Sequence, residues 1–168
     1  MLTLKAGNLF MRAPKIYLET SVFNFYFADD APDKREDTRR LFEEIWQGKY
    51  EPYTSLFVVE ELQAATEPKR SQMLDLIKQY DITALPGENE SRRIAGLYVA
   101  EGIIPEKYLA DALHIAATTV NELDFIVSYN FKHIVKLKTI TMTEIVNLRE
   151  NYHKIGIYSP TEVVEYDE

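Results

Sequence analysis

Short strand-like runs, several of them apolar, alternate along the chain with longer segments in which apolar residues recur every three or four positions. The runs are typical of buried strands in a parallel sheet, and the recurring positions are typical of amphipathic helices. The strand-like runs are residues 16–18, 51–55, 81–85, 125–128 and 155–158. Strands that alternate with helices predict an α/β sandwich.

Helix boundaries are expected where capping residues and glycines flank the periodic segments. Asp33 followed by Glu36 resembles an N-cap with its reciprocal partner, and Gly48 is expected to end that helix. The residues that fall at helical spacing in this segment are Thr38, Leu41, Phe42, Ile45 and Trp46. Another helix is expected to begin near Tyr108, with alanines that let it pack closely on the sheet. A further helix is expected around residues 143–149.

The segment from residue 57 to 66 is predicted to be a helix that carries one acid toward the interior. At about 100° per residue, Val58 and Leu62 share the buried face. Glu61 lies at the edge of this face, whereas Glu60 points away from it. Glu61 is therefore the better candidate for a half-buried functional acid.

Length and composition indicate one domain. The chain has 168 residues, 46% of them hydrophobic, which suffices for one buried core but not for two comfortable domains. We expect residues 1–14 to be an N-terminal extension and residues 15–168 to form a single domain. Because the chain has no cysteine, no apolar stretch of about 20 residues and no export signal, we expect a cytoplasmic protein without a membrane span.

The net charge of −8 at pH 7 disfavours broad adhesion to nucleic acids, because phosphate binding depends on lysine and arginine. A nucleic-acid enzyme of this composition needs a local basic strip. Such a strip follows Asn130 and consists of Lys132, His133, Lys136 and Lys138. These residues are either a surface that binds a phosphate backbone or ordinary solvated charges.

Three acids and one amide stand where predicted elements begin or end. Glu19 and Asn130 each follow a predicted strand, and Asp111 lies in the first turn of a predicted helix. Ligands of open parallel sheets bind beyond the carboxyl ends of the strands, so these side chains are expected to face one cleft. Together with Glu61 they would form an oxygen-rich site. Such a site suits Mg²⁺ or Mn²⁺, which also compensates the repulsion between neighbouring carboxylates.

Each of these residues also has a local explanation. Asp111 is a common type of residue at a helix start, and Asn130 is a common turn residue. Glu61 could be a surface acid at the edge of its helix face, and Glu19 could be the polar end of a strand. The order of all four along the chain is more informative than any one of them.

That order resembles the succession of acidic motifs in the PIN domain. The similar segments are Tyr17-Leu18-Glu19-Thr20-Ser21-Val22, residues 55–62, Asp111-Ala112-Leu113-His114-Ile115-Ala116 and Ile126-Val127-Ser128-Tyr129-Asn130-Phe131. They resemble above all the VapC-like toxins, over residues 15–164. The resemblance implies a PIN-like three-layer sandwich with a mainly parallel central sheet flanked by helices. It also implies a metal-dependent ribonuclease that is often dimeric and often half of a toxin–antitoxin pair.

By position, the resemblance assigns the four acidic positions of the family to Glu19, Glu61, Asp111 and Asn130. The first three would be the metal ligands. Thr20 or Ser21 corresponds to the hydroxyl that supports the first acid. The first acid is a glutamate here, one methylene longer than the usual aspartate, and the fourth position holds a neutral amide. We therefore expect weaker metal binding, with at most one firmly held ion.

The leading hypothesis is therefore a Mg²⁺- or Mn²⁺-dependent endoribonuclease, a hydrolase in which Asn130 orients water or the ion and Lys132 and Lys136 steer the RNA backbone. The alternative is a PIN scaffold with weakened or lost catalysis that binds protein or RNA. A phosphatase-type hydrolase on another α/β fold would need an aspartate directly after the first strand, where this chain has Glu19. The expected partners are RNA, an antitoxin protein and a second copy of the chain.

The aromatic residues after the first motif and two of the histidines are expected to have structural roles. The aromatic residues that follow the first motif are Phe23, Phe25, Tyr26 and Phe27. We expect them to pack in the core and loops, with an interface for an antitoxin helix or a second subunit as the alternative. His114 and His133 are expected to be structural or surface residues rather than ligands.

Overall fold

Five parallel strands form the centre of the molecule. The computed structural model describes residues 12–167. The strands are β1 (Lys15–Leu18), β2 (Glu51–Ser55), β3 (Thr83–Leu85), β4 (Phe125–Val127) and β5 (Gly156–Tyr158). They form one sheet in the order β3-β2-β1-β4-β5, and every neighbouring pair is parallel. β1 is therefore the central strand, and β3 and β5 are the outer ones.

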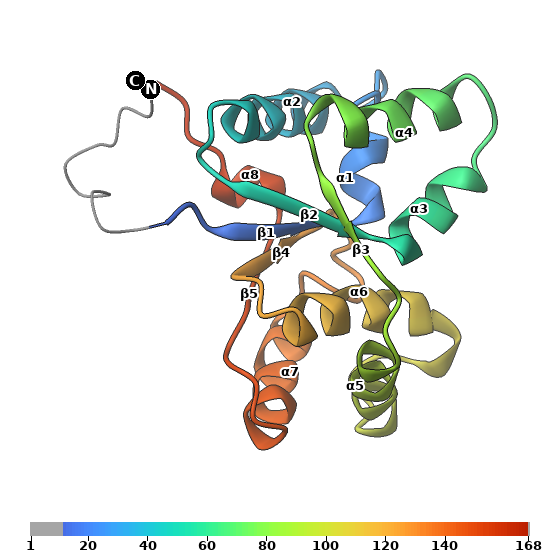
Figure 1. Cartoon of the computed structure of the whole chain (residues 1–168), viewed down its shortest axis with the longest axis vertical. Coiled ribbons are helices and arrows are strands. Elements are labelled where there is room, and N and C mark those ends of the chain that lie inside the picture. Colours follow the sequence, from blue (N-terminus) through green and yellow to red (C-terminus); the bar gives the residue numbers. More distant parts are fainter. Residues whose placement is uncertain (1–11, 168) are drawn as a thin grey trace.

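Helices cover both faces of this sheet. They are α1 (Thr20–Phe25), α2 (Pro32–Trp46), α3 (Leu56–Gln63), α4 (Lys69–Gln79), α5 (Asn89–Ala100), η2 (Glu106–Tyr108, a 3₁₀ turn), α6 (Leu109–Val120), α7 (Leu137–Arg149) and α8 (Pro160–Val163). Helices α1, α2, α4 and α8 lie on one side, α5, α6 and α7 lie on the other, and α3 lies at the end of the sheet where β2 ends (Figure 1). The predicted α/β architecture of helix, sheet and helix layers is confirmed.

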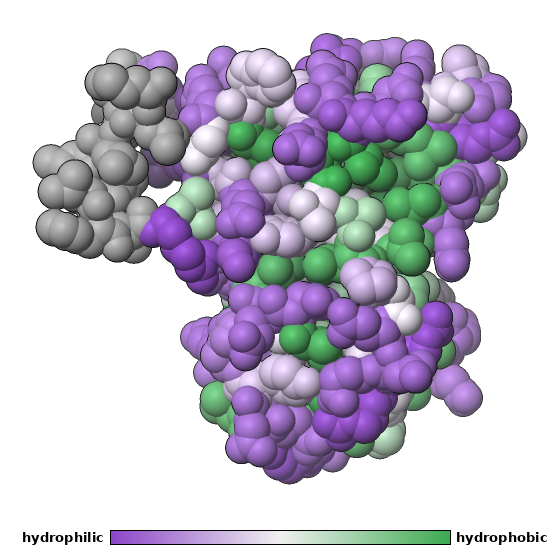
Figure 2. All heavy atoms as spheres, viewed as in Figure 1, coloured by the Kyte–Doolittle hydropathy of each residue, from purple (hydrophilic) through white to green (hydrophobic). Residues whose placement is uncertain are grey.

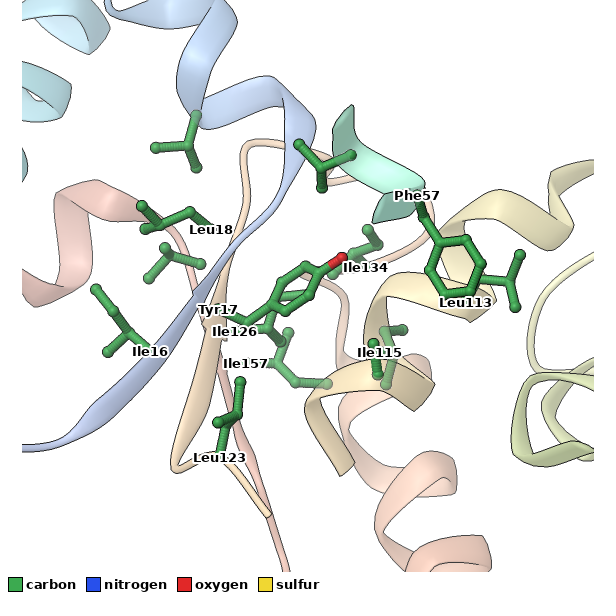
Figure 3. Packing of buried hydrophobic residues seen from close by; sticks show 14 of the residues in the cluster. Ile16, Tyr17, Leu18, Phe57, Leu113, Ile115, Leu123, Ile126, Ile134 and Ile157 are labelled. Carbon is green, nitrogen blue, oxygen red and sulfur yellow. The ribbon is translucent and has the colours of Figure 1, made fainter. Parts of the chain in front are cut away.

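The core forms around the central strand. Ile16, Tyr17 and Leu18 of β1 are fully buried, as a strand covered on both faces must be. Ala112, Ala116 and Ala117 of α6 are also fully buried, which lets this helix approach the sheet closely. Figure 3 shows part of this packing, and Figure 2 shows hydrophilic residues over most of the visible surface, with apolar residues in a band between the two helical layers.

The structure corrects three local predictions. α2 begins at Pro32 with Ala31 as its N-cap, so Asp33 lies in the first turn and does not cap the helix. Proline at the first helical position explains this, because its fixed φ suits a helix start. Trp46 ends α2 with 72% of its surface exposed and is not part of the buried face. α7 begins at Leu137, six residues before Thr143.

A short helix, α1, occupies the aromatic segment that follows the first motif, where no helix was predicted. Phe23 is buried there, and the Tyr26 ring meets the Phe42 ring edge-on at 5.1 Å between centroids. These contacts agree with the core-packing interpretation of this segment.

The start of the described chain is tied to the sheet. Residues 1–11 of the expected N-terminal extension lie outside the described residues. Arg12 donates hydrogen bonds of 2.8 and 3.1 Å to the carboxylate of Asp124, which also accepts a 2.7 Å bond from the backbone of Lys15. Within residues 12–167, no helix combines the length and the apolar character that a membrane crossing requires.

Candidate functional site

The strand order creates a crevice at one end of the sheet. From β1 the chain adds β2 and β3 on one side and then returns to add β4 and β5 on the other. In open parallel sheets this reversal leaves a crevice beyond the carboxyl ends of the two strands where it occurs, here β1 and β4. Glu19 directly follows β1 and Ser128 directly follows β4. The topology therefore brings the first and last sequence motifs together.

Glu19 is held in place by neutral donors. Its side chain accepts hydrogen bonds from the Ser21 hydroxyl (2.6 Å), the Ser21 backbone N–H (3.2 Å) and the Ser128 hydroxyl (2.5 Å). It also serves as the N-cap of α1 and is 5% exposed. Of the two predicted supporting residues, Ser21 is the one that contacts Glu19. Within the described residues, no lysine or arginine forms a salt bridge with Glu19.

Glu61 projects from α3 toward the same place. Its Oε1 accepts hydrogen bonds from the Thr20 hydroxyl (3.1 Å) and from His114 Nε2 (2.5 Å). About two-fifths of the side chain, 40%, is exposed, as expected for a residue at the edge of a helix face. Burial raises the pKa of Glu61, but the bonds from His114 and Thr20 outweigh it and lower this pKa below its ordinary value.

Glu19 and Glu61 share a pocket of about 340 Å³. The residues that line it are Glu19, Thr20, Ser21, Asn24, Glu61, Leu62, Ala65 and Met73. Thr20 contacts Glu61 and Ser21 contacts Glu19, so each hydroxyl of the first motif supports a different acid. Two of the three predicted metal ligands are thus brought together in one hollow.

Asp111 lies beside this pair but is not among the residues that line the pocket. It stands in the first turn of α6, where the helix dipole favours a negative charge. Burial nevertheless raises its pKa, and the charge of Glu19 raises it further, while a hydrogen bond with the Asn130 side chain opposes the shift.

The side-chain oxygen of Asn130 is engaged by the backbone, a contact that the sequence did not predict. Its Oδ1 accepts a 2.9 Å hydrogen bond from the backbone N–H of His133, which closes the turn after β4. With the oxygen engaged there, the amide group is left to donate to Asp111. The sequence-based role for Asn130, orienting water or the ion, stays a prediction.

His114 is the site residue whose position sequence reasoning missed. It is 1% exposed and lies between the Tyr17 hydroxyl, 2.7 Å from Nδ1, and Glu61, 2.5 Å from Nε2. Burial lowers the pKa of His114, but the bond to Glu61 and the charges of Glu19, Glu61 and Asp111 together raise it. All three acids therefore act on this one ring. The available signal was its place one turn after Asp111 on the buried face of a helix.

The donor chemistry of the site fits a hard divalent cation. Glu19, Glu61 and Asp111 carry up to three negative charges, and within residues 12–167 no lysine or arginine pairs with them. Oε2 of Glu61 accepts no hydrogen bond from the described protein, so it is free for a ligand. As the side chains stand, no three His, Asp or Glu residues in the described chain are gathered into one ligand cluster. The carboxylates are instead held by protein hydrogen bonds.

The basic strip begins directly after Asn130. Lys132 is exposed, and its Nζ lies 5.7 Å from the centre of the Tyr108 ring, which in turn stacks near His133 with 4.1 Å between ring centres. Lys136 is exposed at the N-terminus of α7. Neither lysine forms a salt bridge within the described residues, so both charges are available to a phosphate backbone.

Comparison with known proteins does not identify the residues of this site. No protein-family model and no curated protein matches the chain. Among solved structures, a chain of the VapBC2 complex of Rickettsia felis, bound to a DNA fragment from its promoter, is similar at 17% sequence identity and a TM-score of 0.49. The match covers 69% of this chain and 88% of that one. The site is therefore interpreted from its own residues.

Proposed function

We propose that this protein is a Mg²⁺- or Mn²⁺-dependent endoribonuclease of the PIN type. The observation that carries the proposal is the set of three acids without a lysine or arginine partner among the described residues. Folding does not gather carboxylates without compensation, and a divalent cation is the usual one at an oxygen-only site. The order of the four motifs, which resembles that of PIN domains, supports the choice of RNA as substrate.

The residues have separate tasks in this proposal. Glu19, Glu61 and Asp111 would hold the cation, which when bound activates water and stabilises charge on the reacting phosphate. Thr20, Ser21 and Ser128 fix the orientation of the first two carboxylates through their hydroxyls. Lys132 and Lys136 offset the unfavourable net charge of −8 where the RNA backbone would lie.

The decisive experiment is RNA cleavage by the wild type and by Asp111→Asn, each with Mn²⁺ and with EDTA. The wild type is expected to cleave only with metal. Asp111→Asn is expected to lose cleavage while its melting temperature without metal is at least that of the wild type, because a neutral amide of the same shape keeps the packing and removes a half-buried charge. Equal cleavage by the two proteins would reject the assignment.

A non-catalytic PIN scaffold that binds RNA or protein is the second candidate. It is favoured by Asn130, whose amide oxygen is already bonded to His133, and by the absence of a three-ligand cluster among the described residues. Calorimetric titration with Mn²⁺ separates the two proposals. Binding that Asp111→Asn weakens supports the nuclease, and no binding at millimolar metal supports the scaffold.

An antitoxin partner and a homodimer belong to the same proposal, because both accompany VapC-like proteins. Co-expression with the product of a small neighbouring reading frame tests the first. An inhibitory complex would support it, and unaffected cleavage would contradict it. Sedimentation of the purified chain tests the second, and a monomer at micromolar concentration would contradict the homodimer.

A further inference from the structure

A chain of buried hydrogen bonds runs from the core to Glu61. It begins at the Ser55 hydroxyl, passes 2.6 Å to the Tyr17 hydroxyl and 2.7 Å to Nδ1 of His114, and ends 2.5 Å from Nε2 at Glu61 Oε1. Ser55, Tyr17 and His114 are each 0% or 1% exposed. Figure 3 shows Tyr17 extending from β1 through the core, with its hydroxyl on the side of Phe57 and Leu113.

The chain joins four separate elements. Tyr17 lies on the central strand β1, Ser55 ends β2 and caps α3, and His114 lies on α6. Glu61 itself lies on α3, six residues after the cap. An acid with a flexible side chain that is 40% exposed is thus fixed by groups whose own positions are set by the core.

The direction of the last bond is the same whichever way the chain is protonated. An ionised carboxylate only accepts, so His114 Nε2–H must donate to Glu61. With a neutral ring, Nδ1 accepts from the Tyr17 O–H, and Tyr17 in turn accepts from Ser55. With a charged ring, Nδ1–H donates to Tyr17 and Tyr17 donates to Ser55. The buried atoms of the chain are satisfied in both cases, and Glu61 keeps its donor.

We propose that His114, held by Tyr17, is a positioning residue that fixes the Glu61 carboxylate so that its free Oε2 faces the pocket shared with Glu19. This rests on the function proposed above, in which Glu61 is a metal ligand. Residues behind metal ligands commonly orient them through such bonds. The sequence assigned His114 only a structural or surface role, and nothing assigned Tyr17 a role beyond the core.

The test measures Mn²⁺ affinity by calorimetry, apart from cleavage. His114→Ala is expected to weaken Mn²⁺ binding by about 10-fold or more, the usual cost of losing such a partner. His114→Gln is expected to restore most of the affinity, because its amide N–H can replace the Nε2–H donor. Tyr17→Phe is expected to give an intermediate loss of Mn²⁺ affinity. In this variant the His114 ring keeps its Nε2–H donor but loses the Tyr17 hydroxyl that orients the ring.

Tyr98→Phe is the matched control. Tyr98 is also fully buried, and its hydroxyl is bonded to Thr119 and Asn147, away from the site. Both Tyr→Phe variants remove one buried hydroxyl, so both are expected to lose stability. Only Tyr17→Phe is expected to lose Mn²⁺ affinity, and an equal change of affinity in both variants would overturn the proposal.

The remaining outcomes are also decisive. If the wild type binds Mn²⁺ and the His114 and Tyr17 variants bind it equally well, the positioning role fails while the proposed function stands. If His114→Ala and His114→Gln lose binding alike, His114 acts other than as a donor to Glu61, and the proposal is wrong. If the wild type neither binds Mn²⁺ nor cleaves RNA, the proposed function itself fails, and the positioning role fails with it.

Discussion

Glu19 and Glu44 are both almost fully buried, at 5% and 1% exposure, yet their surroundings differ in kind. Glu44 on α2 has two cations within reach, since its Oε2 lies 3.5 Å from both Arg40 Nε and Lys49 Nζ. It also accepts a 3.0 Å bond from the backbone of Glu165. Within residues 12–167, the hydrogen-bond donors to the Glu19 side chain are two hydroxyls and one backbone N–H.

The difference shows how one chain treats two buried carboxylates. The charge of Glu44 is balanced permanently by protein cations, and its bonds connect α2 to the C-terminal segment. The charge of Glu19 is oriented by hydrogen bonds but is not balanced by a lysine or arginine of the described residues, and Glu61 lines the same pocket. A buried acid without a cation is costly, and under the proposed function the divalent cation would compensate it. Glu44 is therefore structural and Glu19 a candidate for metal binding.

The largest expected effect concerns cleavage. Glu19→Gln is expected to reduce Mn²⁺-dependent RNA cleavage by about 100-fold or more, equivalent to about 2.7 kcal/mol of transition-state stabilisation. Glu44→Gln, an identical change at an equally buried site, is expected to leave the specific activity of folded protein unchanged. Initial rates at saturating Mn²⁺ measure both. Similar losses in the two variants would remove the distinction.

The next effect concerns the free energy of unfolding, which the two kinds of acid are expected to change in opposite directions. Glu44→Gln is expected to lower the free energy of unfolding by about 2 kcal/mol, because the buried ion pairs with Arg40 and Lys49 are lost and leave these two cations without their partner. Asp111→Asn, measured without metal, is expected to raise the free energy of unfolding instead. The pKa of Asp111 is raised in the folded state, so its charged form costs stability at neutral pH, and the amide removes that cost. Urea unfolding at pH 7 measures both, and a marked loss in Asp111→Asn would contradict the second.

The smallest effect concerns a carboxylate at the opposite end of the sheet. Asp124, paired with Arg12, has a pKa below its ordinary value, because these bonds outweigh its partial burial. A lowered folded-state pKa stabilises the fold above the unfolded-state pKa, and this contribution is lost as pH falls through the folded-state pKa. Asp124→Asn is expected to cost about 1 kcal/mol at pH 7. Urea unfolding should show that this difference shrinks in strong acid, and a constant difference would contradict the assignment.

Much of the fold could be predicted from the sequence because its elements are strongly periodic. The buried run at Ile16–Leu18 and the alanine-rich face of α6 indicate their elements without any tertiary information. α1 could not be predicted, because its six residues are too few to show a helical period. The exposure of Trp46 could not be predicted either. Helical spacing shows which residues share a face of the helix, but not how far along the helix that face is covered by other parts of the protein.

The candidate site also contains residues that could be predicted from the sequence and contacts that could not. Glu19 and Asp111 could be selected because acids at element ends are visible locally. The bond between Tyr17 and His114 joins residues 97 positions apart, and the bond between Ser128 and Glu19 joins residues 109 apart. Such contacts depend on strand order and helix rotation, which no local pattern encodes. Asn130 shows the same limit, because its oxygen is directed by the turn that follows it.

The outer strands of the sheet have a consequence for assembly. β3 and β5 contain three residues each, and a proline follows closely in both cases, Pro86 directly after β3 and Pro160 two residues after β5. So short an edge offers an incoming strand few unpaired backbone groups, and proline removes a further donor. Growth of the sheet from one molecule into the next, the first step toward fibrous aggregation, is thereby discouraged at both margins. A partner that tried to add a strand to this sheet would find few free backbone groups at either margin.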